Sequence, residues 1–283
     1  CVIIIFIKRN YILGSFMFGF EFLIAYVLLG ILVGIAAGLL GIGGGGIIVP
    51  VLTTLFLAQG ISSENVVHIA LGTSMATIVV TSISSLRAHN KKKGVLWDVV
   101  KMMAPGVLIG TFLATFLASI LSSLFLAIFF SIFMAYVSIQ MFLNKKPKPS
   151  RTLFAPAIQF FSASVIGAIS AMVSIGGGSL SVPYLLWQNV ELKKAIGTSA
   201  AIGLPIAISG TLGYMINGWS HTNLDNLMLG YVSLPAFGIV AFFSFLTAPI
   251  GVKLVHILPV EIVKKVFACL LMILSIKMLL TFI

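Results

Sequence analysis

The sequence has 283 residues, of which 60% are hydrophobic and only 8% are charged. So few charged side chains cannot cover the surface of a water-soluble domain, which excludes that class of protein. The apolar residues form long continuous runs, not the short alternating segments of a membrane β-barrel, so the sequence predicts an all-α membrane protein. The net charge of +11 does not indicate a nucleic-acid partner, because the basic residues gather in short loops between apolar runs.

The first apolar stretch, 1–19, carries two basic residues near its middle. Because a secretory signal peptide needs an uninterrupted apolar core, the sequence predicts an N-terminal extension here. The first membrane helix is expected over Glu21–Leu40. Two cysteines, Cys1 and Cys269, are too few for a disulfide framework or a metal site, and no metal or other cofactor is expected.

A run of glycines interrupts the apolar sequence directly after this helix. Residues 38–50 read GLLGIGGGGIIVP, with four consecutive glycines at 43–46. Each glycine costs a helix about 1 kcal/mol, so the run breaks the helix. In lipid, the freed backbone groups are tolerated only where they face protein or a watery cavity. The sequence therefore predicts polar backbone inside the membrane, followed by a short half-helix over 47–57.

Three further membrane helices complete the first half of the chain. They are expected over 65–86, 97–119 and 121–143. Basic residues gather in two of the segments between apolar runs, 87–94 and 145–152. We therefore predict a first transmembrane repeat over residues 20–144 and a basic cytoplasmic linker over 145–152.

The second half repeats the first and predicts a second transmembrane repeat over residues 153–283. Residues 174–183, SIGGGSLSVP, align with the first glycine break, so that Pro183 falls on Pro50. The tripeptide Gly-Thr-Ser occurs at 72–74 and again at 197–199. Matches at separated landmarks favour an internal duplication. Helices are expected over 153–174, 180–187, 193–217, 227–249 and 260–282.

Basic loops lie on the cytoplasmic side of a membrane protein, and this rule orients the chain. Loop 87–94 falls inside, whereas the corresponding loop of the second half, 220–225, has no lysine or arginine and falls outside. Equivalent loops on opposite sides define an inverted repeat. The predicted fold is therefore an all-α polytopic membrane protein of two inverted repeats, each with a glycine-broken helical hairpin and three transmembrane helices, about eight to ten hydrophobic segments in all. Whether each hairpin spans the membrane or is re-entrant stays open.

The two breaks predict a binding site for an anion. The half-helices are expected to begin near Gly46 and Ser179, where the first N–H groups carry the positive end of the helix dipole. Interrupted helices in matching positions of two halves are typical of a transporter binding site. Close helix packing through glycine is the alternative interpretation. The predicted substrate-binding backbone comprises Gly43, Gly44, Gly45, Gly46, Gly176, Gly177, Gly178 and Ser179.

The hydroxyl groups of the repeated Gly-Thr-Ser are the predicted side-chain donors. Thr73, Ser74, Thr198 and Ser199 each follow the glycine early in a helix that is expected to pack beside a break. The alternative is that these hydroxyls bond back to the carbonyl four residues earlier. His68 is a candidate proton shuttle for coupled transport, with a hydrogen-bonded histidine near the outer interface as the alternative.

In these motifs the chain resembles the sulfite exporter TauE/SafE family of membrane transporters. The resemblance rests on residues 38–50, 68–74, 87–94 and 174–183, and it covers nearly the whole chain from about residue 20. It implies a multi-pass protein of the bacterial inner membrane that moves sulfite, a sulfonate or a similar small organic anion. Ser174 and Ser179 depart from the first repeat, which has glycine at both aligned positions.

The predicted function is a secondary transporter that exports a small sulfur-containing anion. A passive anion channel of the same fold and a non-transporting assembly or sensor protein are the alternatives. The expected partners are the anion and the lipid bilayer, without nucleic acid, and the sequence does not define the oligomeric state. No catalytic pair, phosphate loop or dinucleotide fingerprint occurs in the sequence, so no enzymatic activity is expected.

Overall fold

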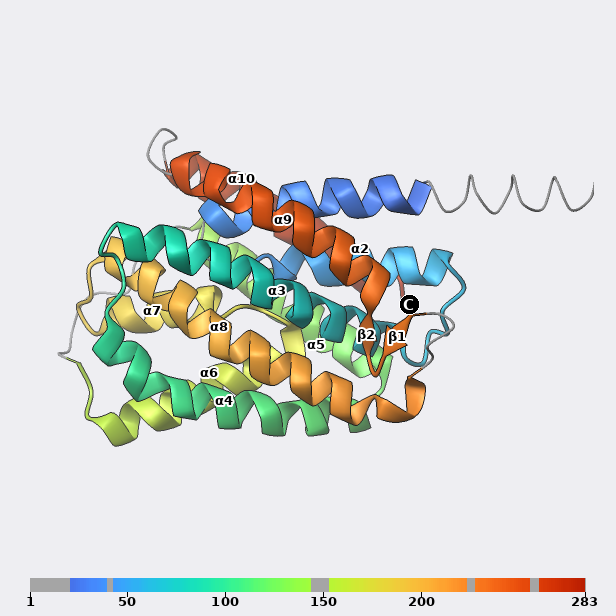
Figure 1. The fold of residues 1–283 in the computed structure, drawn as a ribbon, viewed down its shortest axis with the longest axis horizontal. Helices are drawn as coiled ribbons and strands as arrows, with labels where there is room; N and C mark the ends of the chain where they lie inside the picture. The colour runs from blue at the N-terminus through green and yellow to red at the C-terminus, as the bar shows by residue number, and fades with distance from the viewer. Residues whose placement is uncertain (1–20, 40–42, 144–152, 223–226, 255–259, 283) are drawn as a thin grey trace, which may run out of the picture.

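The computed structural model describes residues 21–39, 43–143, 153–222, 227–254 and 260–282. The predicted N-terminal extension and the predicted linker, 145–152, lie outside these residues. Seven of the described helices are long and apolar enough to cross a membrane, which confirms the all-α polytopic fold class (Figure 1). The helices are Glu21–Leu39, α2 (Gly45–Ala58), α3 (Val66–Lys91), α4 (Trp97–Ile120), α5 (Ser123–Phe142), α6 (Pro156–Val173), α7 (Gly178–Trp187), α8 (Leu192–Asn217), α9 (Leu234–Leu254) and α10 (Val260–Leu280). A short 3-10 helix, Trp219–His221, and a hairpin of β1 (Met228–Leu229) and β2 (Val232–Ser233) follow α8.

The order of the helices is the same in the two halves of the chain. In each half a long helix is followed by a short one, which carries a proline, and then by three long helices. The N-caps of the short helices are Gly44 and Gly177, and a proline lies six residues after each, at Pro50 and Pro183. The two glycine breaks thus align in the structure as they do in the sequence, with the same distance along the chain from the N-cap to the proline.

α3 and α8 run antiparallel through the middle of the bundle (Figure 1). The residues before and after them establish the direction. Near the start of α3, the His68 ring lies 5.1 Å from that of Tyr231, whose backbone N–H donates to Tyr214 O near the end of α8. Beyond the end of α3, the Leu96 N–H donates to the Thr198 hydroxyl near the start of α8. Two helices in equivalent positions of the two halves therefore point in opposite directions.

One end of the bundle collects basic residues. It holds the end of α3, with Arg87 and Lys91, and the start of α8, with Lys193 and Lys194, and the two meet where Gly94 approaches Lys193. We call this the basic end. α9 runs alongside α3 in the same direction, because Ser233 bonds to Thr73 and Phe245 to Ser84. Lys253 in the last turn of α9 is therefore also near the basic end.

Each glycine-broken hairpin starts and ends at the same end of the molecule. In the first hairpin, Tyr26 near the start of helix Glu21–Leu39 donates a hydrogen bond to Gln59, the C-cap of α2. In the second, Gln159 near the start of α6 donates to Gln188, the C-cap of α7. With 14 and 10 residues, α2 and α7 are about 21 and 15 Å long, short of the roughly 30 Å hydrocarbon core. Neither half-helix can span the membrane alone.

Glycine packing joins the first helix of each hairpin to a long helix. In α4, Gly106 and Gly110 lie against backbone carbonyls of α6. In the other half, Gly30 and Gly34 of helix Glu21–Leu39 lie against the backbone of α9. Both pairs are spaced four residues apart, the small-residue pattern that lets membrane helices approach closely.

Three expected helix boundaries were wrong by five residues or more. α3 continues to Lys91 instead of ending at Leu86, because its basic last turn suits the negative end of the helix dipole. α9 begins at Leu234 instead of Leu227 and ends at Leu254 instead of Pro249. The residues before α9 form the β1–β2 hairpin, in which Leu227 and Gly230 adopt positive φ, and Pro235 then favours a helix start.

Candidate functional site

The two breaks have the same backbone geometry. Gly44 and Gly177 both adopt φ of 79°, in the left-handed region that glycine enters at no steric cost. Neither N-cap carries a side chain that could bond to the first turn. Within the described residues, the N–H groups of Gly178 and Ser179 have no backbone acceptor. Each half-helix therefore presents an uncapped N-terminus, where the backbone favours negative charge.

The breaks meet each other at the middle of the bundle. A Cβ atom on Gly43 would lie 2.9 Å from the Gly176 Cα, so the two backbones are in contact. Gly43 also faces Ile78, the thirteenth of the 26 residues of α3, and Gly176 faces Gly203, the twelfth of the 26 residues of α8. The sequence-predicted glycines are thus brought together halfway along the two central helices.

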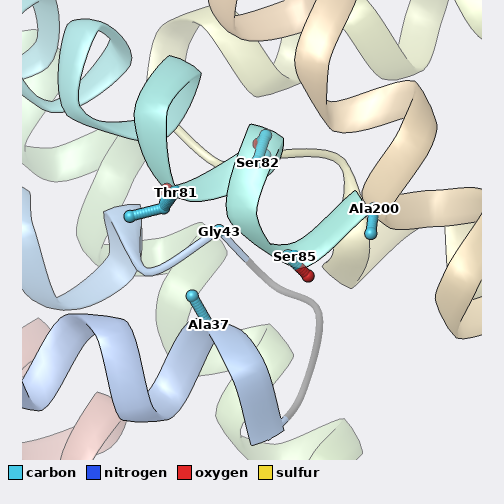
Figure 2. A pocket seen from close by; sticks show the side chains of 7 residues that line it. Ala37, Gly43, Thr81, Ser82, Ser85 and Ala200 are labelled. Atoms are coloured by element: carbon cyan, nitrogen blue, oxygen red, sulfur yellow. The ribbon is translucent and has the colours of Figure 1, made fainter. Parts of the chain in front are cut away.

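A small pocket opens beside this meeting point (Figure 2). Its described lining comes from the two breaks, helix Glu21–Leu39, α3 and α8, and includes no charged side chain. The lining residues are Ala37, Gly43, Thr81, Ser82, Ser85, Gly176 and Ala200.

The pocket lies between the breaks and the basic end. Thr81, Ser82 and Ser85 follow Ile78 toward the basic end of α3, and Ala200 precedes Gly203 toward the basic start of α8. Figure 2 shows the α3 side chains opposite Ala37. The pocket has room for about one water molecule, so an anion would enter it only if the surrounding helices separate. Its uncharged hydroxyls, and the basic residues at its end of the bundle, would then favour an anion that is held by dipoles.

Three pocket hydroxyls are residues that the sequence analysis missed. Thr81 donates to carbonyls one turn earlier on its own helix, whereas the buried Ser85 hydroxyl has no partner within the described residues. The signal was present, since residues 81–85 read TSISS. In α8 the equivalent residues, 206–210, read IAISG, so the hydroxyls of Thr81, Ser82 and Ser85 have no counterpart in α8.

The hydroxyls of Thr73 and Thr198 each bind the backbone directly before another helix, and we call these two contacts the clamps. The Thr73 hydroxyl accepts a hydrogen bond of 2.9 Å from the N–H of Ser233, and the Thr198 hydroxyl accepts one of 3.0 Å from the N–H of Leu96. Ser233 and Leu96 directly precede α9 and α4, which are equivalent helices. Among the bonds of the described residues, neither threonine donates back to its own helix, which was the alternative interpretation. Both hydroxyl oxygens have a structural partner, and donation to an anion remains a prediction.

The glycines before these threonines complete the clamps. Gly72 packs against the Tyr231 carbonyl and Gly197 against the Gly94 carbonyl, each two residues before the clamped N–H. Ser74 and Ser199 follow the threonines, are fully buried, and have hydroxyls without a partner within the described residues.

The other predicted glycines and Ser179 occupy the first turns of the half-helices. Gly45 packs against the Ser174 carbonyl, and Gly46 faces Met134 of α5, so both are also sites of close approach. The Ser179 hydroxyl is buried without a partner in the described part of the chain. Their role in binding an anion is not tested by this geometry.

His68 lies far from the pocket. Its Nε2 is 3.1 Å from Ala118 O and 3.0 Å from Leu121 O, and its Nδ1 is 3.4 Å from Ser123 Oγ. Because carbonyl oxygens only accept hydrogen bonds, Nε2 carries the hydrogen and satisfies the end of α4. This geometry supports the alternative of a hydrogen-bonded histidine near the end of the bundle opposite the basic end. Proton shuttling remains an untested hypothesis.

Three or more metal-binding side chains do not come together anywhere in the described ranges. The candidate site is therefore built from backbone and hydroxyl groups of the described residues, without a cluster of His, Cys, Asp or Glu.

An all-α membrane bundle in which two broken helices meet beside a polar pocket is the architecture of a membrane transporter. Comparison with known proteins also indicates a membrane transporter and identifies its family. The chain belongs to the sulfite exporter TauE/SafE family, whose model matches residues 26–278. The predicted family is thus confirmed.

Proteins of similar sequence occur in bacteria and in an archaeon. A probable membrane transporter protein of Haemophilus influenzae is 34% identical over 260 residues, which cover 92% of this chain and 98% of that protein. One from Methanocaldococcus jannaschii is 28% identical over 247 residues, covering 83% of this chain and 88% of that protein. No solved structure matches the chain. The chain is a membrane transporter, a multi-pass protein of the inner membrane.

Proposed function

We propose that the chain is a secondary transporter that exports a small sulfur-containing anion, such as sulfite or a sulfonate. The observation that carries this proposal is the meeting of two uncapped half-helix N-termini, through Gly43 and Gly176, beside a pocket without charged side chains. Helix N-termini attract anions, and the family's name supports a sulfur oxyanion. An inside-negative membrane potential would drive an anion outward without further coupling.

The antiparallel course of α3 and α8 supports a carrier with two inverted repeats. In such carriers, one half rocks against the other around a central site. A passive channel of the same fold predicts flux that rises linearly with concentration. A carrier predicts flux that saturates, together with counterflow of the same anion.

The test begins with binding to the purified protein. Sulfite, sulfate, thiosulfate, sulfoacetate, taurine and small carboxylates are added separately, and the melting temperature is measured. An anion at 100 times its Kd should raise the free energy of unfolding by about 2.7 kcal/mol. The anion that stabilises the protein is then followed into and out of proteoliposomes.

Ser85→Ala is the variant that ties binding to the pocket. A hydrogen bond to a charged group contributes about 1.5–3 kcal/mol, so we expect at least about a tenfold weaker Kd for the anion. The matched control is Ser131→Ala, which removes another buried hydroxyl without a partner in the described part of the chain, on α5 and outside the pocket lining. Equal affinities in the two variants would place binding elsewhere. No stabilisation and no flux with any of these anions would contradict the proposed function.

A further inference from the structure

The repeat assigns a counterpart to every residue of the pocket. Positions in helix Glu21–Leu39 and the first break recur 133 residues later, and positions in α3 recur 125 residues later in α8. Gly43 and Gly176 are each other's counterparts, so they belong both to the pocket and to the set of counterpart residues. Ala37 of the pocket corresponds to Ser170, and Ala200 corresponds to Met75. Thr81, Ser82 and Ser85 correspond to Ile206, Ala207 and Gly210.

The counterpart positions are filled where the pocket leaves a gap. In the pocket, Ser85 and Ala200 line a gap between α3 and α8 with room for about one water molecule. Their counterparts, Gly210 and Met75, are in contact, since a Cβ on Gly210 would lie 3.0–3.2 Å from the Met75 Sδ, Cγ and Cε atoms. The Met75 side chain is fully buried. A flexible methionine therefore fills the space that corresponds to the pocket.

A polar group is trapped behind this contact. Ser170 is fully buried, and its hydroxyl has no partner within the described residues. One turn further along α6, Ser174 bonds to Leu71 O, one turn before Met75 on α3, and Tyr214, one turn after Gly210, bonds to Ala171 O. These bonds bring Ser170, Met75 and Gly210 to the same region between α3, α6 and α8. A buried hydroxyl without a partner is unfavourable, unless another state of the protein supplies water or a ligand to it.

We propose that Ser170, Ile206, Ala207 and Gly210 line a second access pocket for the transported anion, on the side of the breaks opposite the basic end, and that Met75 is its gate. The inference rests on the proposed function, because two access pockets around one site are what alternating access requires. The present structure is then a state that is closed at Met75 and less tightly packed toward the basic end. In the other state, Met75 leaves Gly210, and the Ser170 hydroxyl faces the anion or water.

Cysteine labelling in membrane vesicles of either orientation tests this gate. Cys1 and Cys269 are replaced by serine, and Ser85→Cys and Ser170→Cys are made separately. A membrane-impermeant charged maleimide should label Ser85→Cys from the basic side faster than it labels Ser170→Cys from the opposite side, because both side chains are buried but only Ser85 borders a gap between α3 and α8. Adding Met75→Ala should increase labelling of Ser170→Cys from the opposite side by about tenfold, because the closed state loses its packing contact. It should also slow labelling of Ser85→Cys.

Met103→Ala is the matched control, since Met103 is a fully buried methionine of α4 that does not line either pocket. It should change neither labelling rate. Labelling of Ser170→Cys from the basic side, or at a rate that Met75→Ala does not alter, would overturn the proposal.

A cross-link gives a second test that does not depend on the folding of Met75→Ala. A disulfide between Met75→Cys and Gly210→Cys should hold the second pocket shut, so that anion flux stops on oxidation and returns on reduction. Flux that continues through the cross-linked protein would contradict the gate. If wild-type vesicles show no anion flux while the labelling pattern follows Met75, the proposed function fails and the gate stands.

Discussion

Gly72 and Gly197 pack directly on backbone carbonyls, those of Tyr231 and Gly94. A Cβ at either position would overlap a carbonyl oxygen that cannot move without displacing the start of α9 or α4. We therefore expect Gly72→Ala and Gly197→Ala each to destabilise the protein by about 1–3 kcal/mol, as overpacking does. Thermal unfolding of the purified protein in detergent measures the effect.

Gly238 supplies the matched control for these two variants. It lies inside α9, and a Cβ there would meet nothing within 4 Å. Gly238→Ala should leave the free energy of unfolding unchanged or raise it by up to about 1 kcal/mol, the difference in helix propensity. Equal melting temperatures for all three variants would mean that the clamps do not hold the loops before α4 and α9.

His68 offers a way to separate a structural role from proton transfer. His68→Ala leaves the Ala118 and Leu121 carbonyls without their donor, and each buried carbonyl that loses its partner costs about 1–3 kcal/mol. The amide of His68→Gln can donate a hydrogen bond but does not titrate. We expect His68→Ala to lower the melting temperature and His68→Gln to recover much of the loss.

The pH profile of anion flux completes that comparison. If His68 is structural, the profile of His68→Gln matches the wild type between pH 5 and 8, the range in which a histidine ordinarily titrates. A profile that becomes flat in His68→Gln, while the melting temperature is retained, would instead support the proton shuttle.

Sequence reasoning found the backbone of the site more readily than its side chains. Four consecutive glycines in a membrane helix have few physical explanations, and Gly43 and Gly176 do meet. A serine or threonine in a membrane helix has several physical explanations, so the residue type does not reveal the hydrogen-bond partner of its hydroxyl. Thr73 and Thr198 were predicted as donors to an anion, yet each accepts from a backbone N–H about 100 or more residues away in the chain. Only the folded arrangement makes that pairing visible.

At the level of helices, the apolar runs predicted the number and order of elements because lipid forces every backbone group into a helix. The failures occur where the chain leaves that constraint. The sequence analysis ended α3 before its basic last turn and predicted helix where the β1–β2 hairpin precedes α9. Charge and hydropathy in these segments indicate how exposed a residue is, but they do not specify the backbone conformation.

The half-helices show what the local sequence cannot specify. The half-helices were expected to begin near Gly46 and Ser179, and they begin one residue earlier, so that Gly45 and Gly178 also belong to the first turns of α2 and α7. Glycine weakens a helix by only about 1 kcal/mol per residue, which tertiary packing outweighs when a carbonyl such as that of Ser174 needs close approach. Each half-helix thus begins directly after a left-handed glycine, Gly44 or Gly177.

Across the whole molecule, the two halves differ mainly in polarity. The element order, the N-caps and the clamps match, whereas the pocket hydroxyls of α3 correspond to residues without hydroxyls in α8. If the two access pockets alternate, the anion meets more hydroxyls on the basic side than on the other. A carrier with such a bias binds its substrate more tightly from one side, which suits net transport in one direction under a steady potential.

The direction of that bias depends on an inverted topology, which accessible loop positions can test. Lys92, Ser63 and Ser220 are exposed, and Lys92 and Ser220 follow the equivalent helices α3 and α8. In a background without Cys1 and Cys269, we expect an impermeant maleimide to label Lys92→Cys only from the cytoplasmic side, because basic loops stay inside. Ser63→Cys and Ser220→Cys should be labelled only from the other side. Labelling of Lys92→Cys and Ser220→Cys from one and the same side would mean parallel repeats, and both access pockets would then lose their assigned sides.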